Sequence, residues 1–184
     1  MECFAVIDTE TNWVDQVMSI GLVVAQTDTM QPLDTKYYIL NPEYQIGGMY
    51  EDTLFIETAQ EPVICSRSAA LDDIQALLHW WNVRSVFAYN ASFDRSHLPE
   101  LRGFSWYDIM RLAAYRQYNP RIPPNAECFS TGRMKRGYGV ESMLRILSGE
   151  KTYCETHNAL DDAMDELEIM RLLGYLVTDY IPLT

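Results

Sequence analysis

Three short acidic motifs lie far apart in this 184-residue chain. Their members are acidic apart from one histidine: Asp8 and Glu10 in FAVIDTETN, Asp94 in FAYNASFD, and His157 and Asp162 in HNALDDAMDE. Asp8 and Glu10 follow an apolar run at residues 4–7, which predicts a buried strand, and residues two apart on a strand share one face. Neighbouring carboxylates repel unless a cation neutralises them, and such oxygen ligands suit Mg²⁺ or Mn²⁺. The motifs therefore predict one metal site.

The same motifs resemble the signature of the DEDDh 3′-5′ exonucleases, the family of ribonuclease T and of the proofreading ε subunit of bacterial DNA polymerase III. In this resemblance Asp8 and Glu10 are the first D and E, Asp94 is the second D, Asp162 is the third and His157 is the h. It covers nearly the whole chain. The family implies two Mg²⁺ or Mn²⁺ ions that clamp the scissile phosphate, with Asp8 shared between them and His157 taking the proton of the attacking water. Histidine suits this task because its ordinary pKa is ~6.5.

The resemblance implies release of nucleoside 5′-monophosphates from the 3′ end of single-stranded DNA or RNA. Three other readings stay open at this point. Asp94 could serve only the first turn of a helix that starts after Asn90 and Ser92. The chain could be a nucleic-acid-binding accessory subunit that has lost catalysis, or an oligoribonuclease-like enzyme that acts on short RNA. A phosphatase with Asp8 as nucleophile would leave His157 unexplained.

Substrate contacts are expected beside the motifs and in a long loop. Thr9, Asn90 and Phe93 adjoin the acidic residues. The loop at residues 119–139 is rich in proline and glycine, and loops of this length are uncommon without a function. It places three cations among aromatic residues, a composition that suits phosphates and bases: Arg133, Lys135 and Arg136. The chain carries a net charge of −12, yet ten basic and five acidic residues give residues 95–151 a net charge of +5.

The sequence predicts that strands and helices of an α/β domain position these residues. Apolar runs predict strands over 4–7, 17–25, 36–40 and 86–89, the first three forming an antiparallel meander. Helical spacing predicts helices over 68–81 with Ser68 as cap, 109–118, 140–147 and 159–175. Residues 41–66 are expected to be irregular with some helix. This order indicates a mixed central β-sheet flanked by helices, compatible with the ribonuclease H-like fold of the family, in a single exonuclease domain over residues 1–184.

The composition indicates the cellular compartment in which we expect the protein. It has neither a secretory signal pattern nor an apolar stretch of ~20 residues, so we expect a cytoplasmic protein with no membrane contact. Its four cysteines show no paired spacing and are expected to be reduced thiols. A protein partner or a homodimer stays open. On the last helix, the helical wheel places Asp162 at the edge of the buried face and Asp161 on the polar side, with Asn158 as N-cap and His157 just before the helix.

Overall fold

The computed structural model describes residues 2–184 and contains one six-stranded sheet in the order β4-β3-β2-β1-β5-β6. Its strands are β1 Cys3–Thr11, β2 Val17–Gln26, β3 Pro32–Leu40, β4 Val63–Cys65, β5 Ser85–Ala88 and β6 Ser105–Asp108. β1, β2 and β3 pair antiparallel, so the meander is confirmed. β5 and β6 run parallel to β1, and β4 runs parallel to β3. The mixed sheet predicted from the sequence is therefore present.

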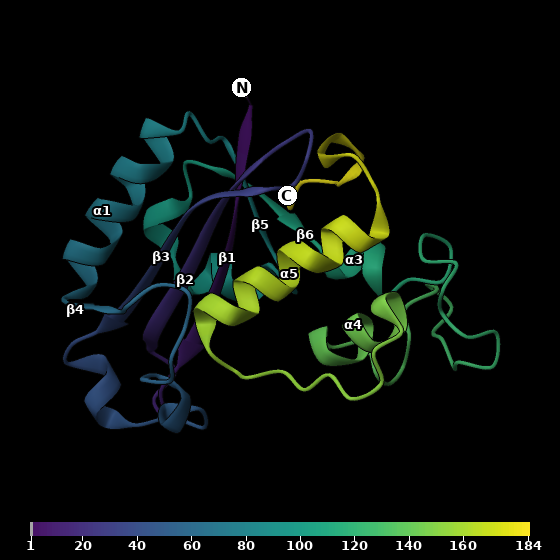
Figure 1. The fold of residues 1–184 in the computed structure, drawn as a ribbon, viewed down its shortest axis with the longest axis horizontal. Helices are drawn as coiled ribbons and strands as arrows, with labels where there is room; N and C mark the ends of the chain where they lie inside the picture. The colour runs from purple at the N-terminus through teal and green to yellow at the C-terminus, as the bar shows by residue number, and fades with distance from the viewer. Residues whose placement is uncertain (1) are drawn as a thin grey trace.

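Helices cover both faces of this sheet (Figure 1). The α-helices are α1 Arg67–Trp80, α2 Ser92–His97, α3 Met110–Ala113, α4 Val140–Ser148 and α5 Ala159–Leu173. Short 3-10 helices are η1 Glu43–Ile46, η2 Glu51–Thr53, η3 Pro99–Leu101 and η4 Val177–Asp179. Among residues 2–184 no helix is long and apolar enough to cross a membrane. The four cysteines are free thiols, as expected.

The alternation of side chains along β1 separates two hydrophobic cores. Phe4 and Val6 pack in the core that contains α3, α4 and α5. Ala5 and Ile7 pack in the other core, with α1 and η3. Because strand residues alternate between faces, the even positions that follow in β1 continue on the α5 side. The core pattern thus directs the first two motif acids toward the helix that follows His157.

The structure corrects two predicted boundaries and adds one strand. The strand expected over 4–7 extends to Thr11, because β2 pairs with it along its whole length. The cap of α1 is Ser66 rather than Ser68, since the Ser66 side chain accepts a hydrogen bond from the Ala69 N–H at 3.3 Å. The short strand β4 within 41–66 was not predicted.

The helix expected over 109–118 is only α3, four residues long. The chain beyond it turns to pair with the 119–139 loop. The Met134 N–H donates to the Ala114 carbonyl at 3.0 Å, and the Asn119 side chain donates to the Ala113 carbonyl at 2.7 Å. These hydrogen bonds compete with helical ones, which explains why local periodicity overestimated the helix. Residues 119–139 lie outside all the helices and strands above, so the loop prediction is confirmed.

Gly21 of β2 permits the start of α5 to touch the sheet, directly beside Asp8 in the strand register. A Cβ atom at Gly21 would lie 2.0 Å from the Ala159 carbonyl oxygen, closer than atoms can approach. We expect Gly21→Ala to lower the free energy of unfolding by ~1–3 kcal/mol or more, because overpacking must displace α5. Denaturant unfolding measures this change. Gly103→Ala is the matched control, since a Cβ there meets nothing within 4 Å, and equal effects of the two substitutions would contradict the prediction.

Candidate metal centre

The carboxyl ends of β1 and β5 meet at one edge of the sheet, because these two strands are parallel. β1 brings Asp8 and Glu10 to this edge. After β5 the chain turns at Asn90, whose φ of +61° is left-handed, and enters α2, which carries Asp94. Asp108 at the end of β6 fixes this turn, because its Oδ1 accepts a hydrogen bond from the Asn90 N–H at 3.0 Å. Asp108 therefore supports the turn between the second motif and its strand.

Asp94 is buried, with 2% of its surface exposed, and its Oδ1 accepts a hydrogen bond from the Thr9 hydroxyl at 2.8 Å. Burial raises the pKa of Asp94 to about 7, although the bond from Thr9 acts to lower it. Asp94 therefore does more than serve a helix end, since its carboxyl group is held against β1. The side chain of Thr9 is also buried and is committed to Asp94. Its hydroxyl therefore helps to position that acid.

The segment before α5 is anchored by the irregular region after β3. The Asn158 side chain caps α5 by accepting from the Leu160 N–H at 3.1 Å, as predicted. Its amide also donates to the Thr53 carbonyl at 2.8 Å. His157 lies outside the helix with a left-handed φ of +55°, and its carbonyl accepts from the Thr53 hydroxyl at 2.5 Å. Contacts far apart in sequence therefore fix the backbone of His157.

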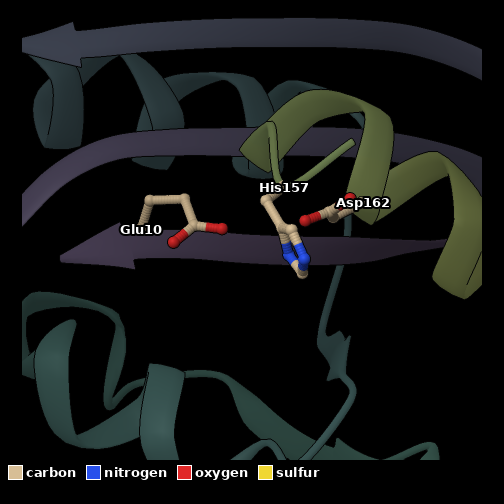
Figure 2. A group of neighbouring side chains, drawn as sticks. All are labelled: Glu10, His157 and Asp162. Atoms are coloured by element: carbon tan, nitrogen blue, oxygen red, sulfur yellow. The ribbon is translucent and has the colours of Figure 1, made fainter. Parts of the chain in front are cut away.

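The ring of His157 stacks on the ring of Tyr50, with centroids 4.0 Å apart and planes inclined by 17°. Ligand atoms of Glu10, His157 and Asp162 all lie within 4.8 Å of one another. Figure 2 shows the carboxylates of Glu10 and Asp162 pointing toward each other with the imidazole of His157 between them. Glu10 comes from β1, Asp162 from the first turn of α5, and His157 from the segment just before this helix. The structure thus brings three of the five motif residues to the spacing of a metal site.

Asp8 and Asp94 lie beside this trio and are coupled to a further acid, Glu166 of α5. Burial raises the pKa of Asp8 well above its ordinary range, and the carboxylates of Glu166 and Asp94 raise it further. Four buried carboxylate oxygens have no hydrogen-bond partner among residues 2–184: Glu43 Oε2 in η1, and at this site Asp8 Oδ2, Asp162 Oδ1 and Glu166 Oε2. Buried polar atoms are nearly always satisfied. Orphaned oxygens of this kind fit a divalent cation, which would neutralise the charge that protein groups leave unbalanced.

The outer part of the site contains a second acid that the motifs did not indicate. Burial raises the pKa of Glu10 to about 8 and that of Asp162 to about 9, and in both cases Glu155 is the next largest cause. Glu155 lies two residues before His157 in an irregular segment, so the sequence offered no periodicity to reveal it. Glu166 was detectable, because it lies four residues after Asp162 and therefore on the same side of α5.

Without divalent cations, the protein is expected to become more stable as the pH falls from about 9 toward 5. The folded-state pKa values of Glu10, Asp94 and Asp162 rise to about 8, 7 and 9, whereas carboxyl groups of an unfolded chain titrate near ~4. Between these pKa values the native state binds more protons than the unfolded state, so the free energy of unfolding decreases as the pH rises. Thermal unfolding in EDTA across this range measures the slope, and Mg²⁺ should reduce it. A Tm that does not change with pH in EDTA would contradict the prediction.

Of the predicted substrate-contact residues, Phe93 and Asn90 lie at the surface beside Asp94. Phe93 is 39% exposed, and the centroid of its ring lies 4.2 Å from the ring centroid of His97. Asn90 is also exposed. A planar exposed ring next to a buried acid offers a surface on which a base can stack.

The predicted cations lie in residues 119–139, which we call the basic arm and which extends past α4 (Figure 1). The Arg133 guanidinium carbon lies 5.1 Å from the ring centroid of Phe129 and 5.2 Å from that of Tyr138. Lys135 pairs with Glu127 at 3.8 Å. The Tyr89 hydroxyl, at the end of β5, donates to the carbonyl of Tyr138. One end of the basic arm is therefore fastened to the edge of the sheet that carries the acids.

No protein-family model matches the chain, and no curated protein matches it significantly. Solved structures of nucleases share its fold. Exonuclease X in complex with 5′ overhanging duplex DNA matches with a TM-score of 0.56 and 22% identity over 95% of each chain. A full-length 3′-exonuclease matches with a TM-score of 0.66 and 15% identity, over 100% of this chain and 91% of that one. The nuclease domain of 3′hExo, a DEDDh family member bound to rAMP, matches with a TM-score of 0.63 and 15% identity. This match covers 100% of this chain and 96% of that one.

These likenesses establish the fold. The chain has the ribonuclease H-like architecture that its motifs implied, a mixed six-stranded sheet flanked by helices. The activity of the chain is a separate question, which depends on the residues at the sheet edge.

Proposed function

We propose that this protein is a divalent-cation-dependent 3′-5′ exonuclease that releases nucleoside 5′-monophosphates from single-stranded DNA or RNA. The observation that carries the proposal is the gathering of Glu10, His157 and Asp162 within 4.8 Å, beside the half-buried Asp8 of β1 and the buried Asp94 of α2. Solved structures of the same fold support it. One contains overhanging duplex DNA, and another contains rAMP, a nucleoside monophosphate.

The acids at the sheet edge would hold Mg²⁺ or Mn²⁺. Glu10 and Asp162 would complete one coordination sphere, Asp8 would be shared, and the carboxyl group of Asp94 would face a second ion. Once bound, such ions lower the pKa of an attacking water and stabilise charge on the entering and leaving oxygens. The protein's own contribution is to position the carboxylates: the Thr9 hydroxyl holds Asp94, and the close approach of α5 at Gly21 brings the helix of Asp162 against the sheet.

His157 is placed to accept the proton of the attacking water. Its backbone is held by Thr53 and its ring by Tyr50, so the imidazole faces the gap shared with the two outer carboxylates. A neutral imidazole nitrogen takes up a proton readily near neutral pH, which suits a general base. Phe93 and the basic arm would contact the bases and phosphates of the strand, respectively.

One assay tests the proposal. Purified protein is incubated with 5′-labelled single-stranded DNA and RNA in Mg²⁺, Mn²⁺ or EDTA, and the products are resolved as a ladder. Stepwise shortening that requires the cation is the expected result. Activity that survives EDTA, or cleavage of circular single strands, would exclude a cation-dependent exonuclease. Binding without shortening would favour an accessory subunit, and shortening confined to short RNA would favour an oligoribonuclease-like enzyme.

The basic arm is expected to contribute substrate affinity. Reversing the charge of Lys135 and Arg136, which are both exposed, should weaken binding and reduce its dependence on salt, because fewer counterions are then displaced. Arg133 is left intact in this variant since its ring contacts also pack the arm. The matched control reverses Arg84 and Arg102, exposed cations near the opposite ends of β5 and β6. Binding assays over a salt series measure both quantities, and equal effects of the two double variants would show that the arm is only a solvated surface.

A further inference from the structure

Glu166 is an acid outside the three motifs, and its buried position is not explained by any ion pair. It lies in the middle of α5 and is 1% exposed. Among residues 2–184 it forms no ion pair within 4 Å. A buried carboxyl group is costly unless its charge is balanced or its oxygens are bonded. Neither condition is met in full, because Glu166 Oε2 has no hydrogen-bond partner.

The surroundings of Glu166 consist of the proposed metal-binding acids. Of the charged groups around Asp8, Glu166 raises the pKa of Asp8 most, ahead of Asp94 and Asp162. Asp94 is likewise the charged neighbour with the largest influence on the pKa of Glu166. Asp8 and Asp94 are thus the main charged neighbours of Glu166, which lies one helical turn after Asp162 with an unpartnered buried oxygen.

Helix geometry explains how Glu166 reaches this place. It follows Asp162 by one turn of α5, so both carboxyl groups lie on the face that packs against the sheet. The close contact of α5 with β2 at Gly21 brings this face near β1. Glutamate is long enough to extend from the second turn of the helix back toward the strand. The orphaned oxygens of Glu166, Asp8 and Asp162 are then buried in one neighbourhood.

We propose that Glu166 supplies an additional carboxylate to the cation site, on its inner side beside Asp8 and Asp94. This inference rests on the proposed function, because it assumes that the site binds divalent cations. It adds a fifth acid to the four of the motifs and increases the negative charge that faces the ions. A different role, a neutral glutamic acid that only fills space, predicts no change in cation affinity when the carboxylate is replaced.

The test measures cation binding in the absence of nucleic acid. Mn²⁺ is titrated into wild-type protein and into Glu166→Gln, and free Mn²⁺ is followed by electron paramagnetic resonance. Glutamine keeps the size and shape of the side chain and removes only its charge, so the fold should be retained. We expect the apparent Kd for Mn²⁺ to rise at least ~10-fold, as is typical when a group that supports a metal site is lost. Glu166→Met, of similar size and without charge, should give the same increase.

Glu168→Gln is the matched control, because Glu168 lies on the same helix and pairs with Arg171 at 2.6 Å on the outer face. It should bind Mn²⁺ as the wild type does. If wild-type protein binds Mn²⁺ and both Glu166 variants bind it equally well, the inference is overturned while the proposed function stands. If the wild type binds neither Mn²⁺ nor Mg²⁺, the proposed metal site itself fails, and the inference fails with it.

Discussion

Asp8→Asn is expected to lower the rate of 3′-end shortening at least ~10²-fold, because the proposed mechanism makes this carboxylate a ligand of both ions and depends mainly on charge stabilisation. The structure places Asp8 at the centre of the acids. Its pKa responds to Glu166, Asp94, Asp162 and Glu10 in turn. An amide at this position keeps the shape of the side chain but removes its negative charge.

The loss should occur without unfolding. Burial and neighbouring carboxylates raise the pKa of Asp8, so its charge disfavours the cation-free fold. Asp8→Asn should therefore match or exceed the wild type in Tm measured in EDTA, and gain less stability from Mg²⁺. Asp72→Asn, at an exposed position of α1, is the control and should leave both quantities unchanged. Wild-type turnover in Asp8→Asn would refute the shared-ligand role.

The part of the site that could be predicted from the sequence depends on local periodicity. Alternation along β1 placed Asp8 and Glu10 on one face, and the two cores confirm which face this is. The helical wheel separated Asp162 from Asp161 and identified Asn158 as the cap of α5, which the structure confirms. In each case a single element determines the geometry, so neighbours in sequence are sufficient.

The remaining features depend on contacts between distant segments. Thr53 holds the carbonyl of His157 across 104 positions, and Tyr50 stacks on its ring. The region at 41–66 therefore has a positioning role that its irregular sequence did not indicate. The role of Gly21 could not be predicted from the sequence either, because its lack of a side chain matters only once α5 lies against it. The hydrogen bond from the Thr9 hydroxyl to Asp94 is a further contact of this kind, because it joins residues 85 positions apart.

Asp162→Asn is expected to abolish activity, whereas Asp161→Asn should retain it. Asp162 is 4% exposed, has an orphaned Oδ1 and lies within 4.8 Å of the Glu10 and His157 ligand atoms. Asp161 is partly exposed, and its Oδ2 accepts a hydrogen bond from the Thr156 hydroxyl at 3.3 Å. The two substitutions are chemically identical and adjacent, so each serves as the control of the other.

The difference follows from where each carboxylate acts. Asp161 lies in the first turn of α5, where a negative charge interacts favourably with the helix dipole, so its loss should cost about 1 kcal/mol of stability or less. Asp162 faces the gap that holds the proposed ions, and its loss should remove Mn²⁺ binding at the outer position together with turnover. Single-turnover rates and denaturant unfolding of both variants separate these effects. Equal losses of activity, or the reverse order, would show that the carboxylate facing the substrate is not the one that the helix buries against β1.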